Sequence, residues 1–104
     1  MKYRVIIQPT AERGIRESMR WLTEHASPNH AAKWLEGLIR AIDTLKSMPG
    51  RGSLAAESEK FPVEIRELLH GRSKPGKHRI LYTIAQGEVH ILYVRHSAQD
   101  ELEP

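Results

Sequence analysis

The stretch from Glu64 to His96 constrains the fold most, because it alternates β-forming segments with turn residues: EIRELLHGRSKPGKHRILYTIAQGEVHILYVRH. Apolar positions with a period of two mark its middle segment as a strand with one packed face, made by Ile80, Tyr82 and Ile84. Gln86-Gly87 is typical of a tight turn, and the segment 71–76 supplies a longer loop. The pattern predicts three consecutive strands, starting near residue 63, that form an antiparallel meander.

The segments before this meander predict one strand and two helices. Tyr3 to Ile7 is rich in β-forming residues and is stopped by Pro9. Apolar residues at helical spacing predict helices over about 11–25 and 28–47, and Ser27-Pro28 is a typical helix start. The region 51–62 lacks a clear period and predicts a loop with at most one short helical turn.

The predicted fold class is α+β in a single domain, residues 1–104: an N-terminal strand, an antiparallel helical hairpin and a three-stranded antiparallel meander. The hairpin must bury its apolar stripes against one sheet face, which leaves the opposite face open and carrying Arg79. Eight residues are expected to be largely buried between these layers: Ile15, Leu22, Leu35, Ile39, Ile42, Ile80, Tyr82 and Ile84.

Composition excludes several classes of protein. The chain has no cysteine, so disulfides and thiol catalysis are impossible. No apolar run approaches the roughly 20 residues of a membrane helix, and no secretory signal is present, so we expect a cytoplasmic protein without a membrane partner. The histidines do not show metal-ligand spacing. The run GRSKPGKH (71–78) resembles a phosphate-binding loop but lacks its Ser or Thr and leads into a strand, so no metal or cofactor is expected.

A basic surface is the remaining candidate for function. Residues 60–96 contain seven Lys and Arg against three Glu. Four cations on or beside the predicted strands could bind a polyanion or an acidic partner: Arg66, Lys77, Arg79 and Arg95. In RNA cleavage Arg79 would hold the scissile phosphate, and His96 would transfer protons near neutral pH. A solvated strand face is the alternative to any such site.

The chain resembles the RelE/ParE superfamily of toxins from bacterial type II toxin–antitoxin systems. The resemblance covers Tyr3 to about Asp100 and includes IREL (65–68), HRILYTI (78–84) and EVHILYVRHSAQD (88–100), in the superfamily's order of strand, two helices and three strands. It implies a growth-inhibiting protein that is neutralised by a cognate antitoxin in a toxin–antitoxin hetero-oligomer.

Two activities occur in this superfamily. RelE-like members cleave messenger RNA on the ribosome, and Arg79 matches their strand arginine. ParE-like members bind DNA gyrase and poison it without nuclease chemistry. The tail after His96 is acidic and lacks a terminal Tyr or His, which favours the ParE-like activity. A degenerate, non-toxic module that only binds the antitoxin is a third possibility.

The resemblance also implies how the antitoxin binds. Antitoxins of this superfamily usually lay an acidic, partly apolar segment over the toxin. The basic sheet face and the flanks near Trp21 and Trp34 are the expected receptor.

Overall fold

A computed structural model describes residues 2–71 and 78–96 of the chain. The elements follow in this order: β1 (Arg4–Ile7), α1 (Pro9–His25), α2 (Pro28–Asp43), the 3-10 helices η1 (Thr44–Lys46) and η2 (Pro49–Arg51), β2 (Ser53–Leu54), η3 (Ala56–Glu59), β3 (Arg66–His70), β4 (His78–Ala85) and β5 (Glu88–His96). The α+β order of strand, two helices and three strands is confirmed. The segment 51–62, predicted as a loop with at most one short helical turn, contains the short helix η3 and also the two-residue strand β2.

Local signals place the helix boundaries close to the expected ones. Pro9 takes a first-turn position in α1, so this helix begins two residues before the predicted start. The hydroxyl of Ser27 accepts a hydrogen bond from the backbone N–H of His30 at 3.0 Å, which confirms the predicted start of α2. The α-helical geometry ends at Asp43, and η1 continues the coil to Lys46.

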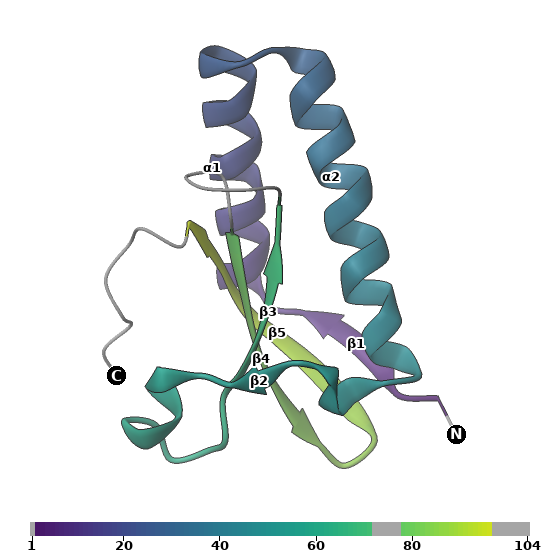
Figure 1. Ribbon diagram of the computed structural model, residues 1–104. Coiled ribbons are helices and arrows are strands. Elements are labelled where there is room, and N and C mark those ends of the chain that lie inside the picture. The colour runs from purple at the N-terminus through teal and green to yellow at the C-terminus, as the bar shows by residue number, and fades with distance from the viewer. Residues whose placement is uncertain (1, 72–77, 97–104) are drawn as a thin grey trace.

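The five strands form one sheet in the order β1-β5-β4-β3-β2. β1 runs parallel to β5, and the remaining pairs are antiparallel, as the predicted meander requires. Gln86 and Gly87 both adopt positive φ, at 50° and 77°, which is the backbone of a tight hairpin turn between β4 and β5. The helical hairpin covers one face of this sheet (Figure 1).

The main core lies between the helices and this sheet face. Of the eight residues expected in the core, Leu22, Ile42, Ile80 and Tyr82 are buried, and Ile15, Leu35 and Ile84 are partly buried against the core. The eighth, Ile39, was predicted wrongly, because its side chain is 56% exposed. The buried stripe of α2 runs through Leu38, and the next residue along a helix is rotated by about 100° away from that stripe.

The sheet face opposite the helices was predicted to be open, and this prediction is wrong because part of that face is covered. Residues 49–61, which we call the strap, run along the end of the sheet remote from the connection between α1 and α2 (Figure 1). A second apolar cluster lies on that face and consists of Ala55, Ile65 and Leu81, with Phe61, Leu92 and Tyr93 packed against it. The strap therefore covers part of the surface on which a polyanion was expected to bind.

Candidate functional site

Arg79 of β4 is held in an ion-pair network with two carboxylates. Its guanidinium donates to both oxygens of Glu57 in η3, at 2.8 and 2.5 Å, and its Nε donates to Glu67 of β3 at 2.9 Å. The side chain of Glu57 is fully buried, and that of Arg79 is 11% exposed. The hydrogen bond with Glu57 is the main reason why the pKa of Arg79 is raised. The expectation that Arg79 lies on an open face is wrong, because the strap supplies its partner.

Arg66 of β3 also holds the strap. Its guanidinium donates to the carbonyl oxygens of Gly50 and Gly52 and to the carboxylate of Glu64. Nearby, the hydroxyl of Tyr82 donates to the carbonyl of Pro49 at 2.7 Å. Two of the four predicted target-binding cations therefore stabilise the protein's own fold.

The structure does not place the other two predicted cations, Arg95 and Lys77, on an open basic surface. Arg95 of β5 is partly buried and lies beside Arg79 in the strand register, so it shares the face that the strap partly covers. Lys77 lies outside the described residues.

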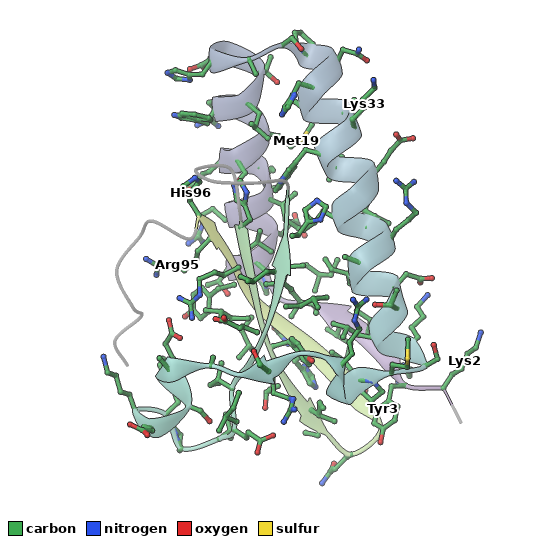
Figure 2. The ribbon with its side chains drawn as sticks, viewed as in Figure 1. Lys2, Tyr3, Met19, Lys33, Arg95 and His96 are labelled. Atoms are coloured by element: carbon green, nitrogen blue, oxygen red, sulfur yellow. The ribbon has the colours of Figure 1, made fainter. Side chains whose placement is uncertain are left out.

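Arg79 and His96 lie on opposite faces of the sheet. His96 pairs with His78 across β4 and β5, with ring centroids 5.3 Å apart, and His78 in turn contacts the ring of Trp34 in α2. This places His96 on the helix side, since side chains alternate along a strand and Arg79 contacts the strap on the other side. Figure 2 shows Arg95 and His96 together at the end of β5. The structure does not bring the predicted phosphate ligand and the predicted proton donor together.

A pocket of about 430 Å³ lies between α1 and the ends of β4 and β5. Its lining residues are Gly14, Glu17, Ser18, Trp21, His78, Val94 and His96. Sequence reasoning did not single out Glu17 or Ser18. Their spacing from Trp21, four and three residues, places all three on one side of α1 and is the signal that could have found them.

The two tryptophans expected to bind an antitoxin have different environments. Trp21 is 56% exposed and borders the pocket. Trp34 is 8% exposed in the main core, where its ring packs against His70 and His78. Its indole N–H is buried without an acceptor among the described residues. Only Trp21 is placed for surface contact in this structure.

Comparisons with known proteins agree with this architecture. A profile of the family described as "ParE toxin of type II toxin-antitoxin system, parDE" matches residues 5–101. The chain belongs to the ParE toxin family. It is therefore a ParE toxin of a type II toxin–antitoxin system, and such a system implies a cognate ParD antitoxin as partner.

Solved structures support the same fold for this ParE toxin. One similar chain comes from the chromosomal ParDE toxin–antitoxin system from P. aeruginosa, with a TM-score of 0.74 and 17% sequence identity over 91% of this chain and 96% of that one. At this identity the likeness concerns the fold. Comparison with curated proteins gave no significant match.

Two features are absent from residues 2–71 and 78–96. No group of three or more His, Cys, Asp or Glu residues is arranged there to hold a metal ion. No helix in this part of the ParE toxin is both long and apolar enough to cross a membrane.

Proposed function

We propose that this ParE toxin arrests bacterial growth by binding DNA gyrase and poisoning it, without cleaving RNA itself. The observation that carries the proposal is the state of Arg79. Its guanidinium already bonds two carboxylates, so a phosphate would have to displace Glu57 or Glu67. Displacing Glu57 would also uncover a carboxylate that is now fully buried.

The position of His96 supports the same proposal. In-line cleavage by the 2′-hydroxyl needs charge stabilisation and proton transfer at one phosphate. Arg79 and His96 face opposite sides of the sheet, so they cannot act on one phosphate in this conformation. A toxin that inhibits gyrase by binding it does not need these two residues to meet at one phosphate.

We further propose that the ParD antitoxin neutralises the toxin through a segment that covers the helix side near Trp21. Trp21 is large, aromatic and exposed beside a pocket, which is typical of residues that dominate binding energy. Trp34 contributes by supporting the core beneath this surface, since it is buried.

Controlled expression with and without the neighbouring antitoxin gene tests the proposal in cells. We expect arrest only without the antitoxin, accompanied by DNA-damage signalling and by intact messenger RNA in primer extension. The variant His96→Ala should arrest growth as the wild type does, because no RNA chemistry depends on this imidazole. Cleaved messages that disappear in His96→Ala would establish RNA cleavage instead, and an absence of arrest would indicate a non-toxic binding module.

A further inference from the structure

The pocket between α1 and the sheet combines an exposed indole with a carboxylate. Trp21 is held in place because its ring stacks on that of His25, with centroids 4.5 Å apart and planes 13° from parallel. A ring nitrogen of His25 also lies 3.0 Å from the backbone carbonyl oxygen of Trp21. An aromatic ring that is already fixed loses little conformational freedom when a partner binds.

Glu17 is the one formally charged residue among the seven that line the pocket. Its carboxylate makes no hydrogen bond or ion pair with any residue in the described part of the chain. Arg13 and Arg20 lie within one turn of it on α1, yet neither lines the pocket. The carboxylate is thus available to a ligand that enters from the pocket side.

A carboxylate and an indole that line one pocket provide the chemistry that binds an organic cation. Cations are attracted to the negative face of Trp, and guanidinium groups form strong hydrogen bonds with carboxylates. The remaining lining residues suit the aliphatic stem of Arg or Lys, since Val94 is apolar and Gly14 carries no side chain. The rings of His78 and His96 complete the lining of the pocket.

We propose that this pocket receives the side chain of one Arg or Lys residue from the ParD antitoxin. The proposal rests on the antitoxin partnership and goes further by naming the residue class that enters the pocket. Charge complementarity selects it, because Glu17 lines this pocket with a carboxylate although the chain as a whole is basic. A single basic residue would thereby fix the register of an otherwise acidic antitoxin segment on the toxin.

Affinity measurements with matched toxin variants test the proposal. The toxin would be recovered from the co-expressed complex and titrated with the purified antitoxin. Glu17→Gln should weaken binding about three- to thirtyfold and reduce its dependence on salt, since one charge contact is lost. Glu24→Gln, also on the exposed surface of α1 but outside the pocket, should bind as the wild type does. Circular dichroism would confirm that each variant is folded.

The antitoxin residue can be found by replacing each of its Arg and Lys residues singly with Met. One replacement should weaken binding to the wild-type toxin and have no further effect on Glu17→Gln. Glu17→Gln binding within twofold of wild type would overturn the proposal, as would a scan in which no basic residue couples to Glu17. If Trp21→Leu alone weakened binding, the pocket would hold an apolar anchor and the cation assignment would be wrong. Gyrase assays on the free toxin are independent of all these results.

Discussion

Removal of the Glu57 carboxylate should destabilise this toxin strongly. Glu57→Ala would take away two hydrogen bonds to Arg79 and leave the guanidinium, 11% exposed, with Glu67 as its acidic partner. Loss of one partner from a buried ion pair costs about 3–5 kcal/mol. Because Glu67 still compensates part of the charge, we expect the free energy of unfolding to fall by about 2–4 kcal/mol. For a domain of this size the melting temperature should drop by about 10–25 °C.

Urea unfolding monitored by circular dichroism measures this effect. Glu59→Ala is the matched control, because Glu59 is exposed on the same 3-10 helix, and its change should stay within about 0.5 kcal/mol. Glu57→Gln should cost less than Glu57→Ala, since an amide oxygen still accepts one hydrogen bond from Arg79. The double variant Glu57→Ala with Arg79→Leu should lose less than the sum of the single changes. A Glu57→Ala protein within about 0.5 kcal/mol of wild type would refute the view that this ion pair holds the strap.

Three further predictions concern packing, each checked by the same unfolding measurement. Leu38→Ala should lower the free energy of unfolding by about 2–5 kcal/mol because Leu38 is fully buried, whereas Ile39→Ala should lower it by less than about 1 kcal/mol. Similar losses of stability at both sites would contradict the observed orientation of α2. Tyr82→Phe should cost about 1–3 kcal/mol, since its hydroxyl accepts from one backbone group of the strap and donates to another. Gly14→Ala should destabilise by about 1–3 kcal/mol, because a Cβ there would overlap the carbonyl oxygen of Val94 and push α1 off the sheet; a neutral result would show that α1 can shift freely.

Local patterns in the sequence were sufficient to predict the order of elements and the main core. The spacing of Ile80, Tyr82 and Ile84 at every second position indicated the middle strand, and Ser27-Pro28 indicated the start of α2. These signals involve only a few neighbouring residues, so they can be recognised without knowledge of the tertiary structure. The exposure of Ile39 depended on the angle at which α2 meets the sheet, and a broad apolar stripe does not determine that angle.

The candidate site was harder to predict because its partners are remote in the chain. Glu57 lies in a segment without periodicity, 22 residues before Arg79, and nothing local marks it as a buried ion-pair partner. A strand arginine paired with a strap carboxylate and one free for phosphate look the same in the sequence. The separation of Arg79 from His96 follows from side-chain alternation together with the register of β4 and β5, in which Arg79 pairs with Arg95 and not with His96.

A supercoiling assay with the purified toxin and purified DNA gyrase tests the proposed target most directly. We expect the toxin to inhibit supercoiling and to accumulate cleaved DNA, and the ParD antitoxin, added in equimolar amount, to prevent both effects. The same toxin preparation should leave messenger RNA intact in a ribosome-dependent translation mixture. Normal supercoiling together with cleaved messenger RNA would contradict the account.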